Sequence, residues 1–303
     1  MTRRGLVLFG AMCVIWGIPY LLIRVAVRDL SPSALVLART AIAALLLLPI
    51  ALARAELWPA FSRLRALLAF AAIEIGIPWV LLNDAEQEIS SSLTALLIAA
   101  VPLIGVVIAA STGGERFGRE SLLGLALGVV GVGAIVGVNL EGAGAIPIAE
   151  VGLVSVCYAV GPVILQRWLA DLPALGVIAA SLALVALAFV PIAAFSLPAE
   201  QPSGKVILCV LGLAIVCTAL AFLLFFALIA EVGSVRATVI TYINPAVAAV
   251  LGVVILDEHF TTGMALGFVL VLLGSVLATR PTRTRPAEAS GYPPTADVPS
   301  PEC

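Results

Sequence analysis

The chain has 303 residues, of which 62% are hydrophobic and 11% charged, and its mean hydropathy is +1.19. Soluble domains carry about 25% charged residues, so this composition excludes a soluble protein and predicts an integral membrane protein. The net charge of −2 at pH 7 gives no indication of a nucleic-acid partner.

Ten apolar stretches are long enough to cross the lipid bilayer as helices, which takes roughly 20 mostly apolar residues. They cover residues 5–27, 32–53, 64–83, 91–111, 121–139, 150–169, 174–196, 206–229, 236–256 and 262–279. The apolar runs are continuous and do not alternate, so a transmembrane barrel is excluded. The sequence therefore predicts an all-α integral membrane fold with ten transmembrane helices. The first stretch lacks an Ala-x-Ala-like site and is interpreted as a retained span, not a signal peptide.

The distribution of basic residues predicts the orientation in the membrane. With a cytoplasmic N-terminus, the arginines on the inner side are Arg3, Arg4, Arg54, Arg63, Arg65, Arg116, Arg119, Arg167, Arg236, Arg280, Arg283 and Arg285. Arg24, Arg28 and Lys205 then lie outside. Both termini are therefore predicted to be cytoplasmic. Arginine outnumbers lysine fifteen to one, which is typical of a GC-rich bacterial genome and indicates a bacterial inner membrane.

Several motifs occur twice, 143 residues apart. Residues 101–117 (VPLIGVVIAASTGGERF) and 244–260 (NPAVAAVLGVVILDEHF) both contain Pro, twelve residues, Glu, one residue and Phe. The same offset relates Pro19 to Pro162, Arg24 to Arg167 and Gly124 to Gly267, and an offset of 142 relates Pro49 to Pro191. This register indicates an internal duplication. Each copy holds five spans, an odd number, so the second copy must be inverted relative to the first, as in many transporters.

These features resemble the drug/metabolite transporter superfamily, and specifically its EamA-type members. The motifs concerned are IWGIPYLLIRVAV in the first span, SPSALVLART entering the second, and the Pro-to-Glu-x-Phe-to-Gly pattern of each half. The second half departs from the pattern where Ala159 and Val160 replace Trp-Gly. The resemblance implies one five-helix repeat over residues 1–140 and an inverted one over 141–280. It also implies transport, commonly export, of amino acids or drug-like solutes. Residues 281–303 are rich in Pro and polar residues and are predicted to form a disordered cytoplasmic tail.

Two charged side chains lie well inside predicted spans, Arg39 in the second and Glu74 in the third. Charges inside a membrane are costly and are functional candidates by default. Neither has a charged equivalent 143 residues on, where Leu182 and Cys217 stand. Features that only support the scaffold should recur in both halves, so we expect Arg39 to bind a carboxylate and Glu74 to bind a proton, a cation or an ammonium group. A structural Arg39–Glu74 ion pair is the alternative.

Aromatic rings in proline-containing spans form a second group of candidates, since proline frees backbone carbonyls that a ligand can use. We expect at least one of Trp16, Tyr158 and Tyr242 to face a solute pathway, although ordinary packing would explain any single ring. Trp79 is assigned to the outer aromatic belt in that packing alternative. Asn244 needs a hydrogen-bond partner on another helix or on the solute.

Glu115 and Glu258 occupy the same place in the two copies. We therefore expect each to end a helix and brace a hairpin, or to act as a gate element, one at each face. The stretch 83–92 (NDAEQEISSS) is predicted to be an outward, solvated loop, which could also draw cations to the pathway. Rows of glycines in 121–139 and 262–279 suit close helix packing and could also form a homodimer face.

No metal ion or cofactor is predicted, because the five cysteines are scattered and the one histidine, His259, stands alone. A membrane-embedded enzyme would need a cluster of such groups, and an accessory or scaffold subunit is a third option. The inverted duplication favours a non-enzymatic secondary transporter. It would move a small organic solute by alternating access, driven by the solute's own gradient or by a proton gradient.

Overall fold

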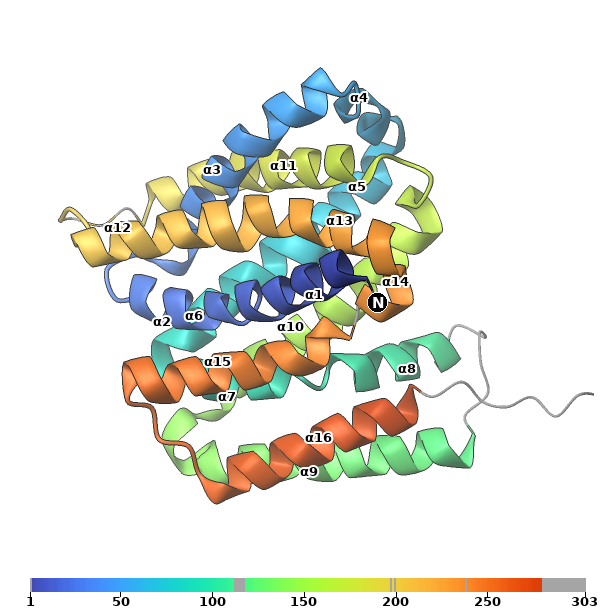
Figure 1. Cartoon of the computed structure of the whole chain (residues 1–303). Helices are drawn as coiled ribbons and strands as arrows, with labels where there is room; N and C mark the ends of the chain where they lie inside the picture. Colours follow the sequence, from blue (N-terminus) through green and yellow to red (C-terminus); the bar gives the residue numbers. More distant parts are fainter. Residues whose placement is uncertain (1, 112–117, 197, 199, 238, 280–303) are drawn as a thin grey trace, which may run out of the picture.

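The computed structural model describes residues 2–111, 118–196, 198, 200–237 and 239–279. Their regular structure is helical throughout, without a strand, which confirms the all-α class (Figure 1). The first half contains α1 (Arg3–Ile15), α2 (Ile18–Ala26), α3 (Pro32–Ala53), α4 (Leu57–Ala60), η1 (Phe61–Arg63), α5 (Leu64–Phe70), η2 (Ala71–Gly76), α6 (Ile77–Glu88), α7 (Ser91–Ile98), α8 (Val101–Ser111) and α9 (Arg119–Ala143). The second half contains α10 (Ala145–Ile164), η3 (Leu165–Leu169), α11 (Ala174–Ala194), α12 (Gly204–Leu211), η4 (Gly212–Leu220), α13 (Ala221–Val232), α14 (Ser234–Ala237), α15 (Ile240–Leu256) and α16 (Thr262–Ala278).

Consecutive helices join into apolar segments that match the predicted spans. Eight are long and apolar enough to cross a membrane: Arg3–Ala26, Pro32–Ala53, Leu57–Glu88, Ser91–Ser111, Arg119–Gly137, Ala145–Leu169, Ala174–Ala194 and Gly204–Val232. The last two predicted spans correspond to the shorter apolar helices α15 and α16, of 17 residues each. The chain is therefore a multi-pass helical membrane protein.

The third segment has 32 residues and extends beyond the predicted window of 64–83 at both ends. The predicted loop over 83–92 is consequently wrong for most of its length, because α6 continues to Glu88 and α7 begins at Ser91. Ser90 caps α7 by accepting a hydrogen bond from the Leu93 amide at 3.1 Å. Polar residues are tolerated here because the helix satisfies its own backbone and several of them are buried against other helices, as Asn83 is when it donates to the Pro32 carbonyl at 3.1 Å.

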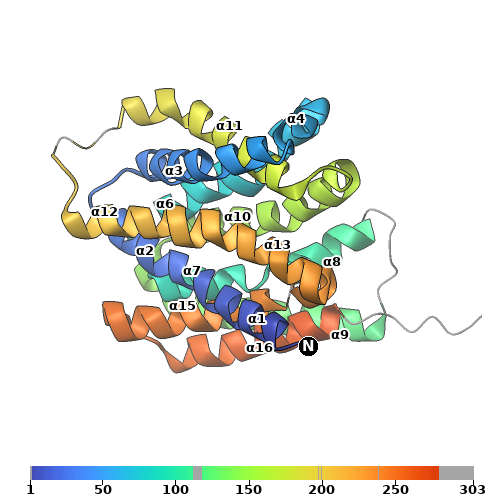
Figure 2. The same cartoon turned by 45° about the horizontal axis from the view of Figure 1, so that its top comes forward.

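Three pairs of helices from corresponding spans of the two halves pack against each other: α3 with α11, α7 of the fourth span with α15 of the ninth, and α9 with α16 (Figures 1 and 2). The members of each pair run antiparallel. Ser31, just before α3, donates to the carbonyl of Ser196, just after α11, at 2.9 Å. Glu258, just after α15, accepts from the amide of Ser91, the first residue of α7, at 2.8 Å.

Glycines allow the backbones of α9 and α16 to touch. A Cβ atom added to Gly131 would lie 2.7 Å from the Gly267 carbonyl oxygen, and one added to Gly274 would lie 2.6 Å from the Gly124 carbonyl oxygen. Residue numbers rise on one helix as they fall on the other, so this pair is antiparallel too. The glycine rows considered above as a dimer face are therefore in contact with each other within one chain.

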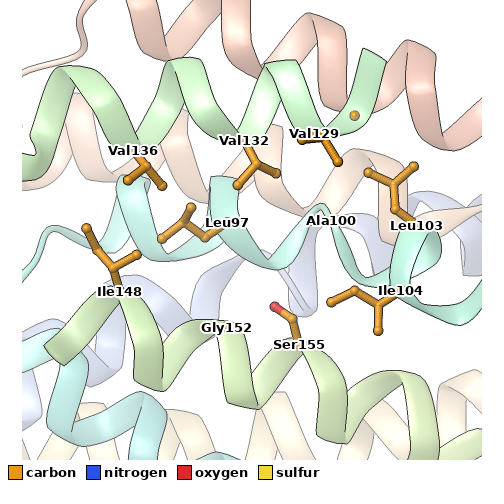
Figure 3. Close-up of a pocket in the computed structure, with 11 residues that line it drawn as sticks. Leu97, Ala100, Leu103, Ile104, Val129, Val132, Val136, Ile148, Gly152 and Ser155 are labelled. Carbon is orange, nitrogen blue, oxygen red and sulfur yellow. The ribbon is translucent and has the colours of Figure 1, made fainter. Parts of the chain in front are cut away.

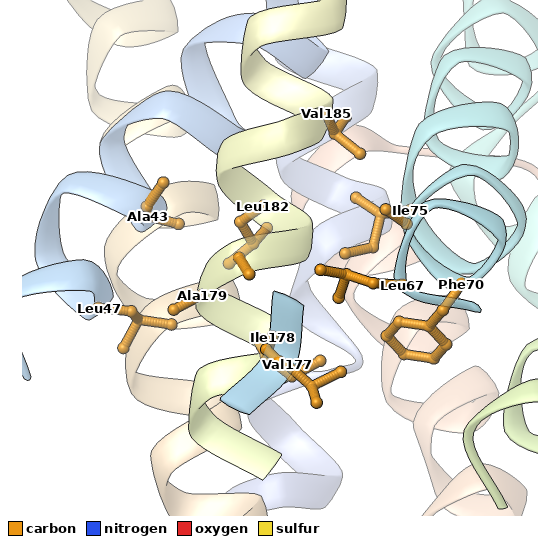
Figure 4. Packing of buried hydrophobic residues seen from close by; sticks show 14 of the residues in the cluster. Ala43, Leu47, Leu67, Phe70, Ile75, Val177, Ile178, Ala179, Leu182 and Val185 are labelled. Atoms are coloured by element: carbon orange, nitrogen blue, oxygen red, sulfur yellow. The ribbon is translucent and has the colours of Figure 1, made fainter. Parts of the chain in front are cut away.

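The largest buried cluster holds the α3–α11 pair against α5 and η2 (Figure 4). Leu47 of α3, Leu67 of α5 and Leu182 of α11 are fully buried in it. Large apolar side chains elsewhere, such as Leu45 and Leu187, point outward, as expected for helices surrounded by lipid.

The two ends of the bundle differ in their polar contacts. At the end that carries the N-terminus, called the N-terminal face, Arg63 forms a two-pronged pair with Asp171 at 2.6 and 2.8 Å. Both side chains are well exposed, so the pair adds little stability. At the opposite end, called the far face, the Ser203 amide donates to Asp29 at 2.9 Å and holds the pKa of that carboxyl below its usual value.

The α9–α16 contact yields a stability prediction. Gly131→Leu should lower the melting temperature of the purified protein in detergent, because the new side chain meets the backbone of α16, and overpacking typically costs about 1–3 kcal/mol or more. Gly133→Leu is the matched control on the same helix, since a Cβ there has no atom within 4 Å. Equal melting temperatures for the two variants, measured by circular dichroism, would contradict the close contact.

Candidate functional site

A group of polar and aromatic side chains meets within the membrane-spanning helices, and we call it the central cluster. It consists of Arg39 (α3), Glu74 (η2), Trp79 (α6), Tyr158 (α10) and Thr218 (η4). Two of these residues were predicted as the principal site, and Tyr158 as one of its aromatic candidates.

Arg39 is only 7% exposed. Its Nε donates to Thr218 Oγ1 at 2.9 Å, and its guanidinium carbon lies 3.6 Å from the centroid of the Trp79 ring, in cation–π geometry. Trp79 is itself buried beneath this charge, so its assignment to the outer aromatic belt is wrong. Among the described residues, the acidic and basic side chains that approach within 4 Å of each other are Arg63 and Asp171. Arg39 therefore contacts an aromatic ring and a hydroxyl group, and no carboxylate.

Glu74 lies on the π-helical turn η2, and its Oε2 is buried without a hydrogen-bond partner. The carboxylate rests against α10 at Gly161. A Cβ atom added there would lie 1.8 Å from Oε2, so glycine leaves the room that the carboxylate occupies. Arg39 and Glu74 do not form the structural ion pair that was considered as the alternative. Tyr158 interacts electrostatically with both charges.

The two halves have the same backbone but different chemistry at this place. The π-helical turn η2 (Ala71–Gly76) has its equivalent in η4 (Gly212–Leu220), 143 residues on. Irregular turns of this kind are frequent at functional sites. Cys217 replaces Glu74 in η4, and at the 142-residue offset that relates α3 to α11, Ser181 replaces Arg39. The charges therefore belong to one copy only.

The other predicted aromatic and polar residues have their contacts elsewhere. The Trp16 ring packs on Phe225 of α13, with centroids 4.7 Å apart, and the Tyr242 hydroxyl lies 3.3 Å from Thr279 Oγ1. The Asn244 amide, oriented with its nitrogen toward the carbonyls, donates to Ile240 and to Cys13 of α1 at 3.0 Å each. Asn244 thus finds the helix partner that the sequence required, and it links α15 to α1.

Glu258 braces the far face. Its carboxylate accepts four hydrogen bonds, at 2.5–2.9 Å, from the amides and hydroxyls of Ser91 and Ser92 at the start of α7. Asp257 adopts a left-handed conformation (φ 55°) that ends α15 and turns the chain toward α7. A carboxylate is favoured at a helix N-terminus, where amides are free and the dipole is positive. Glu115, its equivalent, and the predicted tail 281–303 lie outside the described residues.

Glu86 is buried, although its polar neighbours in the sequence predict a solvated loop. Its side chain is 0% exposed, and neither carboxyl oxygen has a hydrogen-bond partner. The residue was assigned to the solvated loop because it stands among polar neighbours. The repeat offered a signal: its equivalent is Ile229, so Glu86 shows the same asymmetry as Arg39 and Glu74.

A pocket of about 310 Å³ lies between α7, α8, α9 and α10 (Figure 3). It is lined by Leu97, Ala100, Leu103, Ile104, Gly128, Val129, Val132, Val136, Ile148, Gly152 and Ser155. The one hydroxyl, on Ser155, donates to the Val151 carbonyl in its own helix at 2.9 Å. The lining carries no charge, and its residues on α10 lie on a different face of that helix from Gly161. The pocket is therefore separate from the central cluster.

Comparison with known proteins agrees with this architecture. The model of the EamA-like transporter family matches twice, over residues 3–137 and 149–280. The chain is 29% identical over 289 residues to the uncharacterized inner membrane transporter YedA of Escherichia coli K12, covering 91% of this chain and 92% of that one. It is 24% identical to the uncharacterized transporter YvbV of Bacillus subtilis, covering 96% of each. A solved crystal structure shares the fold, with a TM-score of 0.66 at 19% identity over 92% of this chain and 97% of the other. The chain belongs to the EamA-like transporter family.

Proposed function

We propose that the protein is a secondary transporter that moves a small organic solute across the bacterial inner membrane by alternating access. The observation that carries the proposal is a pair of opposite charges among the spans that do not neutralise each other: Arg39, which is buried, and Glu74, which is half-buried with its Oε2 covered. Such charges are costly in a membrane unless a partner arrives. A solute with a carboxylate and an ammonium group would supply both partners.

In this proposal Arg39 binds the carboxylate, because a guanidinium offers several donors in a plane and only Nε is used by Thr218. Glu74 binds the ammonium group or a proton through its free Oε2. Tyr158, which interacts with both charges, lies between the two ends of the solute. Amino acids and drug-like zwitterions fit this chemistry, and export is the direction that the family resemblance implies.

We infer that the ten helical segments form two inverted five-helix repeats. The contact pattern supports this inference because it is preserved when the halves are exchanged. α6 of the first half packs on α10 of the second, and the equivalent helix α13 of the second half packs on α1 of the first. The three pairs of helices from corresponding spans described above run antiparallel, as an inverted repeat requires. Two similar halves of opposite orientation can exchange conformations, which gives inward-open and outward-open states of comparable energy.

The charge distribution makes the N-terminal face cytoplasmic and the far face external. The Glu258–Ser91–Ser92 contact then closes the external side by joining the two halves. Opening toward the outside requires this contact to break, which makes Glu258 a gate element as well as a brace.

Solute counterflow in proteoliposomes tests the transport proposal. Protein reconstituted with a panel of unlabelled amino acids should drive uptake of the matching labelled solute. Glu74→Gln should lower the initial rate by about tenfold or more, the effect of losing one charged contact worth about 1.5–3 kcal/mol. Glu120→Gln, an exposed acid at the start of α9, is the control. No counterflow across the panel would count against a carrier and in favour of an enzyme or an accessory subunit.

Gly161 offers a second test of the same site. Gly161→Ala places a methyl group where Oε2 of Glu74 now lies, so the carboxylate must swing away while the fold is retained. The apparent affinity for solute should fall with little change in melting temperature. Gly152→Ala on the same helix, whose added Cβ has no atom within 4 Å, should leave both unchanged. Equal solute affinities for the two variants would remove the Glu74–Gly161 contact from the site.

Reporter fusions test the inverted topology. An alkaline phosphatase fusion after residue 258 should be active, because this enzyme folds outside the cytoplasm, whereas a fusion after residue 115 should be inactive. A green fluorescent protein series should show the opposite pattern. Placement of residues 115 and 258 on the same side would contradict the inverted repeat.

A further inference from the structure

Glu86 is a buried acid that the proposed solute site does not use. It shares one face of α6 with Trp79 and Asn83, at spacings of seven and three residues, and this face packs on α2 and α3. Asn83 donates a hydrogen bond to the Pro32 carbonyl, and the Trp79 ring forms a cation–π contact with Arg39. Glu86 alone of the three polar or aromatic side chains has no partner, although it is completely covered.

The charged and titratable groups that face Glu86 compensate a negative charge only in part. Arg24 of α2 donates to the backbone carbonyls of Glu86 and Gln87, where it closes the end of α6, and makes no hydrogen bond to the carboxyl oxygens. Tyr20 and Arg39 interact with Glu86 only at longer range. Glu258 acts on Glu86 as a like charge, and it is held at Ser91, five residues further along the chain.

The two acids differ in their surroundings. Four donors at the start of α7 point at the oxygens of Glu258, and donors of this kind favour a carboxylate. An ionised Glu86 would be a buried charge whose oxygens have no hydrogen-bond donor, and it would lie beside a second negative charge, which is costly. A proton on Glu86 removes both penalties, and a side chain with 0% exposure leaves no room for a solvated metal ion.

We propose that Glu86 is a proton-binding site that responds to the closure of the far face. It holds a proton on its carboxyl group while Glu258 is bound to Ser91 and Ser92. When that contact breaks, water reaches Glu86, its O–H bond breaks, and the proton passes to water as hydronium. Closure reverses the step. The link to the transport cycle rests on the proposed alternating access, whereas the bound proton itself does not.

Infrared spectroscopy of the full-length protein in lipid detects the bound proton without any solute. At neutral pH the spectrum should contain the C=O stretch of a protonated carboxyl group that shifts in D₂O. Measured in a Glu74→Gln and Glu150→Gln background, which removes the other orphaned acid and the acid that interacts with Asp84 and Glu88, this component should disappear in Glu86→Gln and persist in Glu88→Gln, an exposed acid two residues away. Glu86→Gln has the shape of the protonated acid, so the protein should stay folded. A component that persists in Glu86→Gln overturns the proposal.

A second variant tests whether the proton on Glu86 depends on the closure of the far face. Glu258→Ala removes the neighbouring negative charge and the closing contact, so the Glu86 component should weaken at neutral pH. An unchanged component would overturn the coupling between the two acids.

Counterflow separates this inference from the proposed function. A pH gradient should stimulate solute uptake by the native protein and by Glu88→Gln, and this stimulation should be lost in Glu86→Gln while counterflow without a gradient remains. Persisting stimulation overturns the role of Glu86 in coupling but leaves transport standing. Absence of counterflow for every solute, with the infrared component behaving as stated, overturns the proposed transport and leaves the proton site standing.

Discussion

The hydrocarbon interior of the membrane requires every backbone amide and carbonyl to be satisfied within the protein, and the rest of this structure depends on that requirement. Nearly all of the described chain is therefore helical, and its outward side chains are apolar. The departures from regular helix are few, and two of them carry the site: η2 holds Glu74, and η4 holds Thr218, which meets Arg39. Irregular backbone and polar side chains occur together because each is tolerated only where other helices cover it.

The internal duplication separates scaffold from chemistry. Where the halves agree, the residues build the bundle: the glycines of α9 and α16 allow two backbones to touch, and the π-helical turns recur at the same register. At some places where the halves differ, one half carries a charge or makes room for one. Glu74 stands opposite Cys217, Glu86 opposite Ile229, and the Gly161 that accommodates Glu74 opposite Ile18. A transporter with two equivalent halves but one solute site needs this kind of asymmetry.

Helix ends supply the electrostatics of the far face. The start of α7 holds the carboxylate of Glu258 with free amides and serine hydroxyls, so a charge on one half stabilises a helix of the other half. The neighbouring Glu86 has no such donors. Two acids of the same kind thus have opposite environments.

The sequence by itself determined the membrane class, the position of most spans, the duplication and the presence of two charges within the spans, because hydropathy, repeat offsets and charged residues can all be read along one chain. The loop predicted at 83–92 was wrong. Its residues are polar, but the equivalent stretch of the second half is helical up to the end of α13. Only the tertiary structure decided that Thr218 and Trp79 meet Arg39, that Asn244 bonds to α1, and that Glu86 is buried and unpartnered. Composition along a helix says how much of its surface is polar, whereas the partner of each polar group depends on which helix lies against that surface.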